Sequence, residues 1–167
     1  MHISLFRAVF FSGLLLLLSN SNSVLAAGSN IAGLALATAS SQNTTTGQTA
    51  IKAIDGVVDG YPGDYTKEWA TLKQKSGAWL QLTWGSAYTI DHVVLHDRPN
   101  TNDQITSATL SFSDGSSVTV GTLANDGTGL TVSFPARTVT GLTLTVTGVS
   151  GTATNVGLAE IEVHNAP

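Results

Sequence analysis

The sequence contains no cysteine and one methionine among its 167 residues. Disulfides and thiolate metal sites are therefore excluded, and stability must come from core burial, with a bound metal ion as a further option. Charged residues make up only 11% of the chain, with seven Lys or Arg against 11 Asp or Glu. This composition offers neither a basic stripe for nucleic acid nor a polybasic patch for a membrane surface, so we expect neither partner.

Long hydrophobic runs are also scarce, and the marked one lies at the start of the chain. It follows His2 and Arg7, extends to Leu18 and is succeeded by polar residues and then small ones up to Ala26. The run is shorter than the ~20 residues of a transmembrane helix, and the pattern is typical of a secretory signal peptide. We expect residues 1–26 to be removed and residues 27–167 to form one secreted, extracellular domain.

Helical periodicity is missing, whereas apolar and polar residues alternate in many short segments, which is typical of strands. One of them places Leu80, Leu82 and Trp84 on a single face, and Asp114-Gly115 between two others predicts a hairpin. The expected strands cover residues 78–85, 88–97, 107–113, 117–121, 130–134, 138–149 and 156–164. The second strand should carry Ile90 and Val94 on one side. Together these segments predict an all-β fold, a β-sandwich of jelly-roll type with loops gathered at its two ends.

One segment rich in glycine and proline concentrates the acidic residues. Asp55, Asp59, Asp64 and Glu68 all lie in it, so over a third of the carboxylates of the chain are crowded into one loop. Such a loop is a candidate site for Ca²⁺, which takes oxygen ligands in flexible cages. The alternative is a solvated surface on which Asp55 caps its own turn.

Four segments, in this order, resemble the discoidin-like, galactose-binding-like family, which includes coagulation-factor type C domains and many carbohydrate-binding modules. They are Asn30-Ile31-Ala32 with Ala39-Ser40-Ser41, then Lys52-Ala53-Ile54-Asp55-Gly56 leading to Thr66 and Trp69, then Trp79-Leu80-Gln81-Leu82, and last Leu158-Ala159-Glu160-Ile161-Glu162-Val163. The likeness covers nearly all of residues 27–167. It implies that the two ends of the domain come together and that a structural Ca²⁺ clamps them.

Carried over by this resemblance, the calcium ligands are both main-chain and side-chain oxygens. They are the carbonyls of Lys52, Val57 and Ala159, the carboxylates of Asp55 and Glu160, and Thr66. The chain departs from the family pattern here, because Thr66 follows Asp55 by eleven residues instead of about five. Asp59 or Asp64, inside this insertion, could replace Thr66. If there is no metal, Glu160 should face solvent.

Arg98, Asn100, Asn102 and Asp103 lie on one expected loop and carry groups that hydrogen-bond sugar hydroxyls. In carbohydrate-binding relatives such residues act with an exposed aromatic ring, and Tyr61 and Tyr65 are the candidates here, since a ring covers the apolar face of a sugar. Alternatively, Arg98 pairs with Asp97 or Asp103 and only fixes the loop.

The sequence lacks the Gly-x-Ser-x-Gly and His-Glu-x-x-His motifs and any other set of groups typical of an enzyme. Trp69 should be core, and His92 and His96 should point the same way as a packed or half-exposed pair, without a third metal ligand. We therefore expect a non-catalytic, lectin-like module that binds glycans through its loops and holds a structural calcium ion. The alternatives are an adhesion module that binds protein or lipid headgroups, as type C domains do, and a small hydrolase.

Overall fold

The computed structural model describes residues 25–166, so nearly all of the predicted signal peptide, residues 1–26, lies outside the described residues. The described part is all-β and contains no α-helix. Its strands are β1 (Leu36–Ala39), β2 (Trp69–Ala70), β3 (Trp79–Asp97), β4 (Ile105–Phe112), β5 (Ser117–Val120), β6 (Leu130–Val149) and β7 (Gly157–Asn165). Three short 3₁₀ helices precede most of them, namely η1 (Ala32–Leu34), η2 (Ala50–Ile54) and η3 (Tyr65–Lys67).

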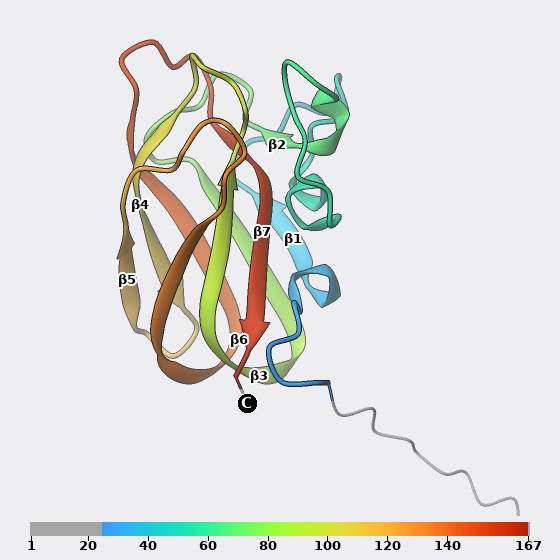
Figure 1. Ribbon diagram of the computed structural model, residues 1–167, viewed down its shortest axis with the longest axis vertical. Coiled ribbons are helices and arrows are strands. Elements are labelled where there is room, and N and C mark those ends of the chain that lie inside the picture. Colours follow the sequence, from blue (N-terminus) through green and yellow to red (C-terminus); the bar gives the residue numbers. More distant parts are fainter. Residues whose placement is uncertain (1–24, 167) are drawn as a thin grey trace, which may run out of the picture.

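Two long strands organise the sheet. β3 has 19 residues and β6 has 20, and they pair with each other along most of their length. The first half of β3 also pairs with β1, and its second half pairs with β7. The strand order is β2-β7-β3-β6-β4-β5, and the sheet folds over on itself at the bends of β3 and β6 to give two layers (Figure 1). The predicted β-sandwich is confirmed, although each long strand had been predicted as two.

The register of β3 explains both its bend and a wrong prediction. Residues 84–87 of β3 face only Thr140 of β6, which is a bulge that curves the strand. A second register shift, between Ile90 and His92, reverses the side of the strand on which the following side chains lie. Ile90 is therefore buried with Val93 and Leu95, whereas Val94 lies on the outer side. The expectation that Ile90 and Val94 share a side is wrong, because strict alternation does not survive a bulge.

The core fills the space between the two layers with aliphatic and aromatic side chains. Leu80, Leu82 and Trp84 all face it, as predicted from their alternation. Trp69 is fully buried, and its indole N–H donates to the main-chain oxygen of Ser41 at 2.9 Å. Because a buried indole needs such a partner, this bond anchors the loop that contains Ser41 against β2.

The two ends of the domain lie side by side, as the family resemblance implies. Asn30 forms a β-bridge with His164, and the main-chain N–H of Ile31 donates to the oxygen of Val163 at 2.7 Å. Since β7 is also hydrogen-bonded to β2 and to the second half of β3, it ties the start of the domain to the layer that these strands form.

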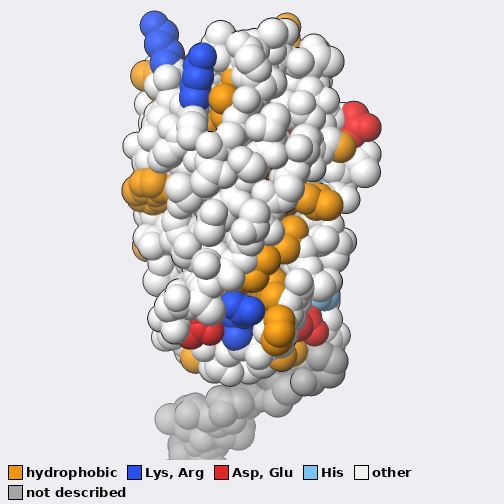
Figure 2. All heavy atoms as spheres, turned by 90° about the vertical axis from the view of Figure 1, so that its left-hand side faces the viewer, with side chains coloured by type: hydrophobic (Ala, Val, Ile, Leu, Met, Phe, Trp, Pro, Cys, Tyr) orange, Lys and Arg blue, Asp and Glu red, His pale blue; other side chains and the backbone are white. Residues whose placement is uncertain are grey.

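The surface carries few charges. On the side formed by β4 and β5, Lys and Arg side chains gather only near the two ends of the molecule, and most of the face is uncharged (Figure 2). Across residues 25–166, no helix has the length and apolar character that crossing a membrane requires.

Candidate functional site

Loops from four parts of the chain meet at the upper end of the sandwich in Figure 1. Their side chains enclose a hollow of about 350 Å³. Its lining residues are Thr46, Gln48, Tyr61, Tyr65, Arg98, Asn100, Asp103 and Asn155. The structure thus brings together five of the six residues predicted to bind a ligand. Asn102 is not among the lining residues. Its carbonyl accepts hydrogen bonds from the hydroxyls of Ser150 and Thr152 and holds the neighbouring loop.

Arg98 lies at the base of the hollow and is only 3% exposed. Its Nη2 is 2.7 Å from Oε1 of Glu68, and its Nη1 is 3.4 Å from Oδ2 of Asp103. Asp97 accepts the main-chain N–H of Arg98 instead of its guanidinium. The predicted pairing with Asp103 is therefore observed. The pairing with Asp97 is not, because Asp97 lies on the core side of β3 and the guanidinium extends toward the loops.

Glu68 is the main residue of the site that the sequence did not predict. It is completely buried, and besides Arg98 it accepts hydrogen bonds from Nε2 of Gln48 at 2.5 Å and the main-chain N–H of Tyr61 at 3.0 Å. Gly60 lies against this carboxylate so closely that a Cβ would collide with Oε2. A buried carboxylate needs this number of donors to offset its lost hydration. Its only trace in the sequence was its membership of the acidic segment.

Asp103 connects two loops beneath the hollow. Its Oδ2 accepts from Nδ2 of Asn100 at 2.9 Å in addition to Arg98, and its Oδ1 accepts from the main-chain N–H of Thr154 at 2.6 Å. Asn155, on the same loop as Thr154, accepts a second hydrogen bond from Arg98. The polar floor of the hollow is therefore held rigidly before any ligand arrives.

Tyr61 and Tyr65 supply the aromatic part of the lining. They are 53% and 46% exposed, respectively, whereas Arg98 and Asp103 are buried below them. The rings present apolar area to solvent beside anchored donors and acceptors, an arrangement that suits a ligand with one apolar face and several hydroxyls.

The predicted metal site centres on Glu160, and the expectation that Glu160 faces solvent without a metal is wrong. Glu160 is 1% exposed. Its Oε1 accepts the main-chain N–H of Gly56 at 3.2 Å, while Oε2 is buried without a hydrogen-bond partner in the described part of the chain. Burial above all, and then the nearby carboxylates of Asp55 and Glu162, raise the pKa of Glu160 to about 8. A cation beside Oε2 would favour the charged form and offset both the burial and the repulsion, so this carboxylate fits a metal ligand.

The other predicted metal ligands divide into two groups. Asp55 lies near Glu160, and its Oδ1 accepts the main-chain N–H of Val57 at 3.1 Å, so it also caps its own turn. Its Oδ2 is 3.6 Å from Nζ of Lys52. Ala159, whose carbonyl is the remaining expected ligand of β7, is fully buried next to Glu160. The two carboxylates of Asp55 and Glu160 are hard oxygen donors, a ligand type that fits Ca²⁺.

Thr66 belongs to a separate set of contacts. Its hydroxyl donates to Oδ1 of Asp64 at 2.6 Å, and its main-chain N–H donates to the same atom at 3.0 Å. These bonds lower the pKa of Asp64. Asp59 accepts the main-chain N–H groups of Gly60 and Asp64. The carboxylates of the acidic segment thus point to different partners, and within residues 25–166 no group of three or more His, Cys, Asp or Glu side chains is arranged to hold a metal ion.

Two further side chains of β3 have notable surroundings, namely Asp97 and His92. Burial raises the pKa of Asp97 to about 7, although the carboxylate accepts main-chain N–H groups of Arg98 and Ile105 at 2.9 Å each. Asp97 thereby fixes where β3 ends and the loop begins. His92 and His96 lie on the same side of β3, as predicted, but their rings have separate partners. The ring of His92 stacks on His164 of β7, with 4.4 Å between centroids.

Comparisons with known proteins place this fold. The family described as "Domain of unknown function (DUF7402)" matches residues 30–164. No curated protein matches the chain.

Solved structures match over most of the chain. The family 32 CBM of C. perfringens NanJ, in complex with galactose, is 22% identical at a TM-score of 0.64, covering 81% of this chain and 98% of that one. Chitosan-binding module 1 of a chitosanase/glucanase from Paenibacillus sp. IK-5 is 29% identical at 0.64, covering 82% and 99%. A Streptococcus pneumoniae fucose-binding module is 16% identical at 0.61, covering 83% and 96%. These matches confirm the predicted galactose-binding-like jelly roll.

Proposed function

This chain belongs to the DUF7402 family, described as a domain of unknown function, and we propose that it is a carbohydrate-binding module that recognises a glycan in the hollow between Tyr61, Tyr65 and Arg98. One observation carries the proposal: two half-exposed tyrosine rings stand over a buried, fixed network of polar groups. The solved relatives of the same fold are named for galactose, chitosan and fucose, which supports the same ligand class here.

The charges of the hollow limit which glycans fit. Glu68 and Asp103 together place two carboxylates around the single guanidinium of Arg98. The surplus is negative, so uronic acids and sulfated sugars are disfavoured by repulsion in a partly desolvated site. Neutral sugars and sugars with amino groups are favoured. Both carboxylates are already paired with Arg98, which supports binding without catalysis.

Tyrosine removal is the appropriate test because the tyrosines are exposed. We expect Tyr65→Ala and Tyr61→Ala each to weaken glycan binding at least tenfold, since stacking against an aromatic face is lost while the buried network stays intact. Leu72→Ala is the matched control, because Leu72 is a loop residue of similar exposure, 62%, outside the hollow. The measurement is calorimetric titration of the best ligand from a glycan array. Unchanged affinity in both tyrosine variants would refute this site.

A structural calcium ion is the second part of the proposal. Glu160 and Asp55 would hold it with the carbonyls of Lys52, Val57 and Ala159, and the buried, unpartnered Oε2 of Glu160 supports this assignment. Bound there, the ion would join the η2 loop to β7 by neutralising the two carboxylates. Thr66 is a weaker candidate because its hydroxyl already donates to Asp64.

Calcium should therefore raise the melting temperature by binding the folded state alone. We expect a clear rise at millimolar Ca²⁺ that EDTA reverses and that Asp55→Ala abolishes. Asp114→Asn is the control, since Asp114 lies in the exposed hairpin turn and Asn-Gly keeps that turn type. A rise that persists in Asp55→Ala would place the ion elsewhere.

Export completes the proposed function. The signal-like pattern of residues 1–26 supports secretion to the extracellular space, where a glycan-binding domain without disulfides would act. The mass of the exported chain tests this, because cleavage after Ala26 leaves Ala27 as the first residue.

A further inference from the structure

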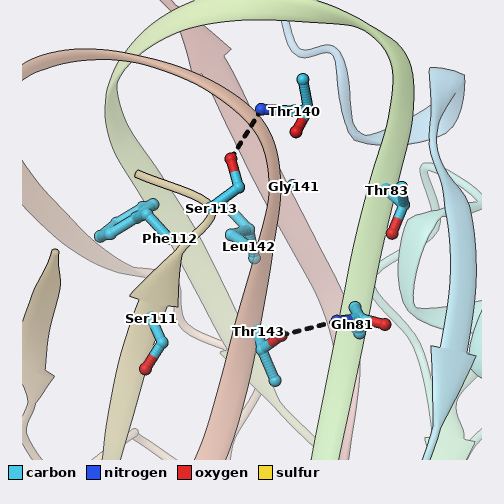
Figure 3. A pocket seen from close by; sticks show the side chains of 9 residues that line it. All are labelled: Gln81, Thr83, Ser111, Phe112, Ser113, Thr140, Gly141, Leu142 and Thr143. Carbon is cyan, nitrogen blue, oxygen red and sulfur yellow. Dashed lines mark hydrogen bonds between the residues drawn. The ribbon is translucent and has the colours of Figure 1, made fainter. Parts of the chain in front are cut away.

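A second hollow lies on the outer face of the sheet, at the end opposite the loop site. It measures about 260 Å³ and is formed by three adjacent strands, β3, β6 and β4 (Figure 3). Gln81 lies opposite Thr143, and Thr143 lies opposite Ser111, so one polar row crosses all three strands. The next row joins Thr83 to Gly141. None of the residues lining the loop site lines this hollow.

The hollow exists because of the local chain geometry. Gly141 leaves the position opposite Thr83 without a side chain, and a Cβ there would lie 2.8 Å from the main-chain oxygen of Leu82. On one side the bulge of β3 at residues 84–87 curves the strand. On the other side Ser113, at the start of the 113–116 turn, accepts the main-chain N–H of Thr140 at 2.8 Å. The depression is therefore built into the strand register.

The lining is polar and uncharged. Gln81 donates through Nε2 to the hydroxyl of Thr143 at 3.2 Å, which fixes the amide across the row. The hydroxyl-bearing side chains of Thr83, Ser111 and Thr140 are exposed around it. Amide and hydroxyl groups match the hydrogen-bonding groups of a sugar, and no charged side chain lines the hollow, so a neutral ligand is favoured.

We propose that this hollow is a second carbohydrate site, which binds one or two rings of a neutral saccharide on the sheet face. The site shares its ligand class with the proposed function at the loops but none of its residues, so either site can bind when the other is disabled. With both sites at opposite ends of the sandwich, the module would contact one polysaccharide, or two chains, at two points and gain avidity.

Amide shifts in ¹H–¹⁵N NMR spectra of the folded domain test the proposal. The probes are three neutral oligosaccharides, namely hexasaccharides of β-glucose, β-mannose and β-galactose. We expect at least one to shift the amides of Gly141 and Thr143, both in the wild type and in Tyr65→Ala. Persistence in Tyr65→Ala separates this site from the loop site, so failure of one does not imply failure of the other.

Two variants locate the binding. Ser111→Tyr fills the hollow from an exposed strand position that tolerates an aromatic residue, and it should reduce affinity at this site at least tenfold. Thr119→Tyr is the matched control on the same face of β5, outside the hollow, and should leave affinity unchanged. If Ser111→Tyr does not fold, Thr143→Val removes the hydroxyl that holds Gln81 and should weaken binding several-fold. The proposal is overturned if no probe shifts these amides or if Tyr65→Ala abolishes their shifts. It is also overturned if Ser111→Tyr or Thr143→Val binds like the wild type.

Discussion

The buried pair of Glu68 and Arg98 makes a strong prediction about stability. In Glu68→Gln the volume is kept, but the charge that faces Arg98 is removed and an amide NH₂ is placed among groups that already donate, Gln48 and the main-chain N–H of Tyr61. Glu68 is fully buried and Arg98 nearly so, which leaves the guanidinium with Asp103 at 3.4 Å as its remaining ion-pair partner. Breaking a buried pair in this way costs about 3–5 kcal/mol.

Urea unfolding followed by tryptophan fluorescence measures this cost, and the thermal midpoint should fall by on the order of 10 °C. Glu162→Gln is the matched control, because Glu162 is partly exposed in its contacts with His96 and His164, and its loss should cost at most about 1 kcal/mol. The double variant Glu68→Met with Arg98→Met should recover part of the loss, since only Asp103 then lacks a cationic partner and it keeps its hydrogen bonds from Asn100 and Thr154. A cost below about 1 kcal/mol for Glu68→Gln, or a double variant worse than the sum of both single variants, would refute the reasoning.

Two further predictions concern the carboxylate of Glu160 and the glycine Gly60, which lies against Glu68. In EDTA the pKa of Glu160 is raised to about 8, so the folded state holds this proton more tightly than the unfolded state. The stability that this proton contributes is fully present below about pH 4.5. It should be lost as the pH rises toward 8, a loss on the order of 3 kcal/mol. Urea unfolding at pH 5 and pH 8 checks this, and either Ca²⁺ or Glu160→Gln should flatten the dependence. An unchanged slope in Glu160→Gln would contradict it. Gly60→Ala should displace Glu68 and cost several kcal/mol in the same assay. Gly121→Ala, whose added Cβ would enter open space, should cost about 1 kcal/mol or less.

The sequence predicted best those features that depend on near neighbours in the chain. Asp114-Gly115 forms the expected turn, with Gly115 at φ 85° and Ser111 paired to Ser117 across it. Leu80, Leu82 and Trp84 are buried together because each is two residues from the next. Such patterns follow from backbone geometry alone, so no tertiary information is needed to find them.

Long-range partners could not be predicted in the same way. Glu68 and Arg98 are thirty residues apart, and only the closure of the sandwich brings them together. The bulge that moves Ile90 to the core side leaves no local mark, since β3 continues through it without a proline or a turn sequence at that point. The acidic segment is the clearest case. Its composition predicted a candidate Ca²⁺ site, but its carboxylates separate in the fold, one to the guanidinium, one toward β7 and two to their own loop.

This separation also changes how Arg98 should be tested. If Arg98 were exposed in a loop, it would only contact the ligand, and Arg98→Ala would report on ligand binding alone. Buried between Glu68 and Asp103, it supports two loops, so its removal would leave two carboxylates uncompensated and disturb the positions of Tyr61 and Asn155. Loss of binding in that variant would therefore not distinguish contact from support. The exposed tyrosines separate the two roles, because they touch the hollow while the ion pairs below them stay closed. The buried charges make the site rigid, so its contacts with a ligand must be tested by substituting the exposed tyrosines at its rim.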